Sequence, residues 1–144
     1  MNSRRPLLLV LLLFLSFANP SYAANWVDAG GNDSISVYVD TQSLRRSGAK
    51  VKVWTKWVYA KPWEVKGSYP AKTYQSSKQL SVYHCEERTT VTLQITRYVD
   101  SETAEVADDA SGADMASRYS EVAPDTIGES LLEFACQRTA TKKK

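Results

Sequence analysis

Hydrophobic and polar residues alternate strictly in the segment Ile35–Asp40, and the segment Val51–Ala60 has the strongest strand pattern of the chain. In the second segment one set of alternate positions holds Val51, Val53, Thr55, Trp57 and Tyr59, and the other holds Lys52, Trp54, Lys56 and Val58. A period of two is typical of a β-strand that has one face on a core and the other in water. Both segments are therefore predicted to be half-buried strands.

Two more extended segments follow, Tyr74–Cys85 and Thr89–Tyr98. The second is rich in threonine and aliphatic residues, which favour strands over helices. Glycine, proline, asparagine and aspartate interrupt regular structure between the strands. We expect a turn at Gly30–Asp33, a turn or short helical loop at Thr41–Lys50, an irregular connection at Pro62–Pro70, and a hairpin or loop within Asp100–Gly112.

The segment Pro124–Cys136 has the pattern of a short helix. Its apolar residues recur at helical spacing and form one stripe, made of Ile127, Leu131, Leu132, Phe134 and Ala135. Thr126, followed three residues later by Glu129, is a capping-box pattern that satisfies backbone N–H groups of the first turn. Strands followed by one segregated helix predict an α+β fold, with an antiparallel sheet of about five to six strands and the helix on one face.

The N-terminal residues 1–23 have the features of a signal peptide. Arg4 and Arg5 precede an apolar run that is shorter than the roughly 20 residues of a membrane span, and small residues follow at Ser21 and Ala23. We expect cleavage after Ala23, a single mature domain at residues 24–144, and no stable membrane insertion after the leader is removed. The protein is then exported, to the periplasm or to the cell surface and beyond.

The charge of the chain argues against a nucleic-acid partner. The full sequence has 18 basic and 16 acidic residues, and removing Arg4 and Arg5 leaves 16 of each. Basic residues gather between Arg45 and Lys78 and acidic residues between Asp100 and Glu133, a pattern that most often reflects solvated faces. The sequence leaves the oligomeric state open.

The two cysteines, Cys85 and Cys136, are the only ones in the sequence. In a chain with a signal peptide they are predicted to form one disulfide, which ties the helix to the sheet. His84 is the only histidine and neighbours Cys85 on a strand, where adjacent side chains point to opposite faces and cannot form a nucleophile–base pair. We therefore predict no catalytic residues, no metal site and no cofactor.

Cations and aromatic residues are interleaved in the segment Lys52–Tyr74. Such a combination suits anionic polymers, glycans or protein partners, although alternate residues of the segment are expected to be core. The candidate binding residues are Lys52, Trp54, Lys56 and Trp63.

Several of these segments together resemble the surface-adhesin protein E family of small exported bacterial proteins. They are Trp26-Val27, Tyr38-Val39-Asp40, Val51-Lys52-Val53-Trp54, Tyr74 with Ser76-Ser77 ahead of Cys85, and Pro124-Asp125-Thr126 leading to Cys136. The resemblance implies an antiparallel sheet with a disulfide-tied C-terminal helix, and a lipoprotein adhesin that binds host matrix proteins. This chain differs because no cysteine lies near the leader, where a lipid would be attached. We expect a non-enzymatic, adhesin-like binding protein or, alternatively, a periplasmic structural or inhibitory module that acts on an envelope protein.

Overall fold

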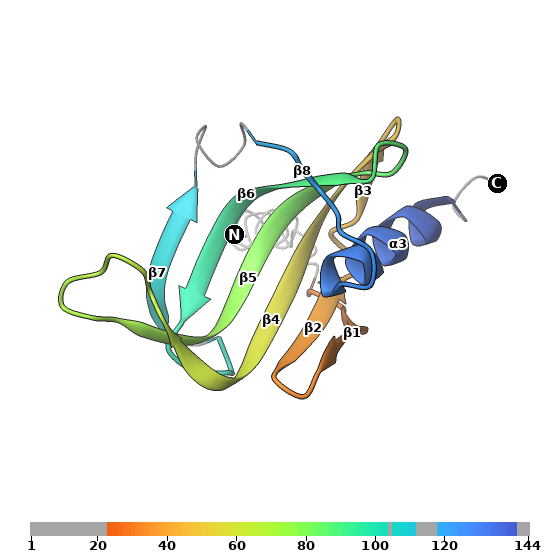
Figure 1. Cartoon of the computed structure of the whole chain (residues 1–144). Helices are drawn as coiled ribbons and strands as arrows, with labels where there is room; N and C mark the ends of the chain where they lie inside the picture. Colours follow the sequence, from red (N-terminus) through yellow and green to blue (C-terminus); the bar gives the residue numbers. More distant parts are fainter. Residues whose placement is uncertain (1–22, 104, 112–117, 141–144) are drawn as a thin grey trace, which may run out of the picture.

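The computed structural model describes residues 23–103, 105–111 and 118–140. In these ranges a curved antiparallel sheet packs one side against a helix (Figure 1). The strands are β1 (Trp26–Asn32), β2 (Ile35–Asp40), β3 (Arg45–Ser47), β4 (Lys50–Glu64), β5 (Thr73–His84), β6 (Thr89–Tyr98), β7 (Val106–Ser111) and β8 (Ser120–Glu121), and the helix is α3 (Ile127–Ala140). The predicted leader lies outside these ranges, except for Ala23. Within them, no helix is long and apolar enough to cross a membrane.

The strands follow the order β1-β2-β4-β5-β6-β7, with β3 paired to β4 and β8 paired to β6. Every pair is antiparallel. The predicted arrangement of an antiparallel sheet with one C-terminal helix is confirmed, but the predicted number of five to six strands is too low, because the described sheet has eight. Two of the additional strands, β3 and β8, have only three and two residues, too short for a hydrophobic period to develop.

The glycine pair predicted as a turn belongs to β1 instead. Gly31 pairs with Ser36, and the turn is confined to Asp33 and Ser34. Gly30 and Gly31 have φ angles of 112° and 154°, and a Cβ on Gly31 would collide with the carbonyl oxygen of Ile35. Glycine therefore permits a bulged, close approach of the two strands here, rather than ending the strand.

Three other predicted connections contain strands. Arg45–Ser47, predicted as a turn or short helical loop, pairs with the start of β4. The predicted irregular connection begins later than Pro62, because β4 continues to Glu64. The pairing between β4 and β5 is interrupted from Val58 to Trp63. Pro62, which has no backbone N–H to donate, lies inside this interruption and so costs the sheet no hydrogen bond there. The predicted hairpin or loop after Asp100 contains β7.

Helix α3 begins directly after Thr126, as the capping pattern requires. Thr126 Oγ1 accepts a hydrogen bond from the Glu129 N–H at 3.3 Å. The Glu129 carboxylate accepts from the Asp125 N–H at 2.8 Å and also contacts the guanidinium of Arg88. The helix continues to Ala140, beyond the predicted end at Cys136.

The core lies between α3 and one face of the sheet. Its helical side is made of Leu131, Leu132 and Ala135, and its strand side of Val37, Val39, Val51, Val53 and Tyr83, all of them buried. The alternation of β2 and β4 therefore points the aliphatic positions at the helix, as predicted. Burying each of these valine or leucine side chains stabilises the fold by about 1.5–3 kcal/mol.

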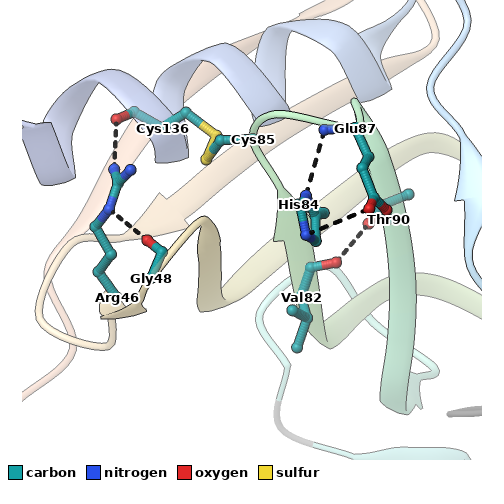
Figure 2. Close-up of a disulfide and its surroundings, with 8 residues drawn as sticks. All are labelled: Arg46, Gly48, Val82, His84, Cys85, Glu87, Thr90 and Cys136. Atoms are coloured by element: carbon teal, nitrogen blue, oxygen red, sulfur yellow. Dashed lines mark hydrogen bonds and ion pairs between the residues drawn. A yellow bond between two sulfur atoms is a disulfide. The ribbon is translucent and has the colours of Figure 1, made fainter.

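The predicted disulfide between Cys85 and Cys136 is present and joins the end of β5 to the second half of α3 (Figure 2). Arg46 adds a second link at the same place. Its Nη1 donates to the Cys136 carbonyl at 3.4 Å, and its Nε donates to the Gly48 carbonyl at 3.0 Å. The helix is thus held by packing, by one covalent bond and by a hydrogen-bonded arginine.

Candidate functional site

Strand β4 separates the candidate binding residues from the core. Val51, Val53 and Thr55 are buried on the helix side of the sheet. Lys52, Trp54 and Lys56 occupy the alternate positions and so project from the opposite side, which we call the far face. Lys52 is exposed, whereas Trp54 and Lys56 are half-buried.

Lys56 lies among aromatic rings on the far face. Its Nζ is 4.8 Å from the centre of the Tyr38 ring and 5.6 Å from that of the Trp26 ring. Tyr38 is the direct partner of Lys56 across the β2–β4 pair, and Trp26 reaches the same place from β1. A cation over aromatic rings at such distances is stabilised by about 0.5–1 kcal/mol at an exposed site and by more when desolvated.

A second lysine, Lys78, stands directly opposite Lys56 across the β4–β5 pair. Its Nζ lies 5.1 Å from the centre of the Tyr98 ring on β6. Like charges placed directly opposite each other on neighbouring strands destabilise a sheet. The two lysines therefore carry an electrostatic cost at the centre of the far face, which the aromatic rings offset in part.

Beside these lysines the far face is hollowed, with a volume of about 360 Å³. The residues that line the hollow come from β1, β2, β4, β5 and β6 and, for Ala24, from the segment ahead of β1. They are Ala24, Trp26, Asp40, Trp54, Lys78, Gln94, Thr96 and Tyr98. Asp40 is held in place, since its Oδ1 accepts from the Asn25 N–H at 2.9 Å and from the Gln42 N–H at 3.0 Å. The pKa of Tyr98 is raised by burial and by the nearby Asp109 carboxylate.

Trp63 lies in a different aromatic group, at the C-terminal end of β4. Its ring centre is 5.2 Å from that of Tyr59, which in turn meets the Tyr74 ring edge-on at 5.5 Å. Arg97 lies over the Tyr74 ring and forms an ion pair with Asp108, with 2.6 Å between Nη1 and Oδ2. The structure therefore brings Lys52, Trp54 and Lys56 onto one strand face and separates Trp63 from them.

His84 and Cys85 do not form a catalytic pair. Cys85 is bonded to Cys136, and His84 Nδ1 accepts from the Glu87 N–H at 3.3 Å (Figure 2). Among the residues that the structure describes, no group of three or more histidine, cysteine, aspartate or glutamate side chains is arranged to hold a metal ion.

Sequence reasoning missed Trp26, Tyr38, Lys78 and Tyr98, which the sheet brings to the hollow or to its rim. The signal was available in part, because Tyr38 occupies a polar-face position of an alternating strand. Its meeting with Lys56, and that of Lys78 with Tyr98, depends on the register between strands.

The described residues thus form an antiparallel sheet with one disulfide-tied helix and a hollow lined by aromatic residues on its far face. The family profile of Surface-adhesin protein E matches residues 26–137, and the chain belongs to this family. No curated protein sequence matches it.

Solved structures with a similar fold are those of protein E from Haemophilus influenzae. One has 13% sequence identity and a TM-score of 0.58, with 88% of this chain and 94% of that chain covered. Crystal form II of the same protein has 12% identity and a TM-score of 0.56, covering 83% of this chain and 99% of that chain. Protein E from non-typeable Haemophilus influenzae has 13% identity and a TM-score of 0.58, covering 86% and 83%. At these identities the likeness concerns the fold.

Proposed function

We propose that this protein is an exported, adhesin-like binding protein that contacts a protein or extracellular-matrix partner and acts by binding rather than by catalysis. Membership of the surface-adhesin protein E family supports an adhesin-like role and an exported or surface location. The disulfide supports export as well, because such bonds persist in oxidising compartments.

The observation that carries this proposal is a group of exposed apolar side chains at one end of the sheet. Trp63 is 50% exposed and Tyr69 is fully exposed, and both lie in the β4–β5 hairpin, which extends past the edge of the sheet (Figure 1). Val99 and Val106 are also exposed and lie at the same end, where β6 ends and β7 begins. We call these four residues the hairpin patch.

The hairpin patch has the composition of a protein contact surface. Tryptophan and tyrosine dominate the binding energy of protein interfaces, because they bury a large area at a small entropy cost. A polar rim surrounds the patch, formed by exposed Lys61, Lys66 and Lys72 together with Glu64 and Glu105. An apolar centre within a charged rim is the usual anatomy of an interface.

The patch is tested by measuring the affinity of the exported protein for immobilised extracellular-matrix proteins. Tyr69→Ala, alone and combined with Trp63→Ala, should weaken binding at least about tenfold, as is typical of aromatic hot spots. Tyr69 is the cleaner position, since Trp63 also packs on Tyr59. Circular dichroism of both variants checks that the fold is retained, and unchanged affinity would exclude the patch.

A matched variant, Trp54→Ala with Lys56→Ala, asks whether the far face contacts the protein partner instead. If this variant binds the matrix protein with the same affinity as the unmodified protein, the far face does not contact the partner. If binding is lost only in this variant, the contact surface is on β4 and not in the hairpin.

The alternative location and role have their own test. A periplasmic structural or inhibitory module would be protected from protease added to intact producing cells and would be released by osmotic shock. A surface adhesin would be cleaved on intact cells. Cleavage supports the proposal, and protection with release by shock supports a partner in the cell envelope.

A further inference from the structure

We propose that the hollow of the far face, which Lys78 lines and Lys56 adjoins, is a second binding site specific for a sulfated saccharide, with the two lysines sharing the sulfate and the aromatic rings contacting the sugar. This site is separate from the hairpin patch and does not depend on it.

The first observation is the lysine pair itself. Lys56 and Lys78 are direct cross-strand partners on the two central strands of the far face, and both are half-buried. Within residues 23–103, 105–111 and 118–140, no carboxylate forms an ion pair with either lysine. The two ammonium groups lie over rings on opposite sides of the β4–β5 pair, and an anion that draws both of them towards it would accept a charge-assisted hydrogen bond from each.

The second observation is the distribution of charge over the far face. The central strands carry Lys52, Lys56 and Lys78, whereas its carboxylates belong to the flanking strands, with Asp28 and Asp40 on β1 and β2 and Asp109 on β7. Each carboxylate already accepts a hydrogen bond: Asp28 from Gly30 N–H at 2.8 Å, Asp40 from Asn25 and Gln42 N–H, and Asp109 from Thr96 Oγ1 at 2.5 Å. The hollow itself is lined by Lys78 and by Asp40, so a compact anionic group held at the lysines fits it, whereas a long polyphosphate backbone would meet the carboxylates.

The third observation is the lining of the hollow. Trp26, Trp54 and Tyr98 offer flat apolar rings beside the hydrogen-bonding groups of Gln94 and Thr96. A pyranose ring has the matching combination of an apolar C–H face and a rim of hydroxyl groups. The volume of about 360 Å³ is at the lower end of the roughly 300–1,000 Å³ of small-ligand sites, which favours a short saccharide unit over a folded partner.

The test uses the exported full-length protein and a heparin-derived tetrasaccharide, followed by calorimetry and by tryptophan fluorescence. We expect saturable binding that weakens as ionic strength rises towards about 1 M, where the screening length falls to about 3 Å. Lys56→Gln and Lys78→Gln should each reduce affinity at least about tenfold, the equivalent of one charge-assisted contact. Lys56→Arg, which keeps the charge over the rings, should retain most of the binding and guards against a loss caused by misfolding.

Lys52→Gln is the matched control, because Lys52 lies on the same strand and face but pairs with Val82 rather than with a second lysine. It should change affinity less than about twofold, within the range of a screened surface charge. An equal loss in Lys52→Gln and Lys78→Gln would show attraction to surface charge alone and would overturn the site. Equal affinity in Lys56→Gln, Lys78→Gln and the unmodified protein would also overturn it.

Two probes decide the ligand class, and one variant separates the hollow from the hairpin patch. Desulfated heparin, which keeps its carboxylates, should bind more weakly than heparin, and equal binding would overturn the specificity for sulfate. A short poly-glutamate peptide should not compete, and effective competition would identify an acidic peptide as the ligand instead. Trp63→Ala with Tyr69→Ala should leave tetrasaccharide binding unchanged, so a failure of the hairpin patch and a failure of the hollow give different results.

Discussion

The two faces of strand β4 differ in chemistry although they share one backbone. On the helix side, Val51 and Val53 are fully buried beneath Leu131 and Leu132. On the far face, Trp54 and Lys56 are half-buried among rings and a second cation. The difference indicates that one face provides the stability of the domain while the other keeps polar groups in an electrostatically costly arrangement that stability does not require.

Substitutions can separate these two roles, because changes on the helix side should lower stability, whereas changes on the far face should alter binding with little loss of fold.

The disulfide, which holds the helix against its face, should have the largest effect. Replacing both partners, Cys85→Ser with Cys136→Ser, should lower the free energy of unfolding by roughly 4 kcal/mol, the chain-entropy estimate for a closed loop of this length. Chemical denaturation with and without reductant measures the change. A loss below about 1 kcal/mol would mean that packing alone holds the helix.

The next largest effect is expected in the core beneath the helix. Leu131 is 1% exposed, and Leu131→Ala should cost about 3 kcal/mol through lost burial and the cavity that remains. Ser130→Ala, at the neighbouring exposed position, should change stability by less than about 0.5 kcal/mol. Denaturation midpoints that agree for the two variants would contradict the assignment of the buried face.

A smaller effect is expected at the start of α3. Thr126→Ala removes the acceptor for the Glu129 N–H and should cost about 1 kcal/mol. Thr126→Ser keeps the oxygen and should restore most of the stability. If both variants lose the same amount in thermal unfolding, the methyl group rather than the cap accounts for the effect.

The smallest effect at neutral pH concerns the buried Tyr83, whose pKa is raised far above its ordinary value by burial. The Tyr83 hydroxyl loses its proton near pH 10 in the unfolded chain and only at higher pH in the folded protein. Its contribution to the free energy of unfolding is therefore fully present below about pH 10 and is lost as the pH rises above it. Stability should fall by at most about 1.4 kcal/mol per pH unit from this group. The free energy of unfolding of Tyr83→Phe should fall less steeply above about pH 10 than that of the unmodified protein. Identical slopes would contradict the proposal that Tyr83 contributes to this loss of stability.

Local patterns predicted the helix side of the molecule well. The alternation in Ile35–Asp40 and Val51–Ala60 identifies the residues that face the core, and the Thr126–Glu129 pattern marks the start of the helix. Two cysteines in the sequence left one possible internal pair. The weakest local predictions concerned short strands and the residues that usually interrupt strands. Gly31 and Pro62 lie within strands here, because the strand pairing is irregular close to each of them.

The sequence by itself determined which residues of β4 turn away from the core, including Trp54 and Lys56. Only the tertiary structure decided what they meet there. Lys56 faces Lys78 because β4 and β5 pair in one particular register, and a shift of one residue would move Lys78 to the other face. Trp26 and Tyr98 come to the hollow from β1 and β6, which are far apart in the sequence. Register and strand order arise from pairing between distant segments, so a period read along one strand determines its buried face but not its neighbours.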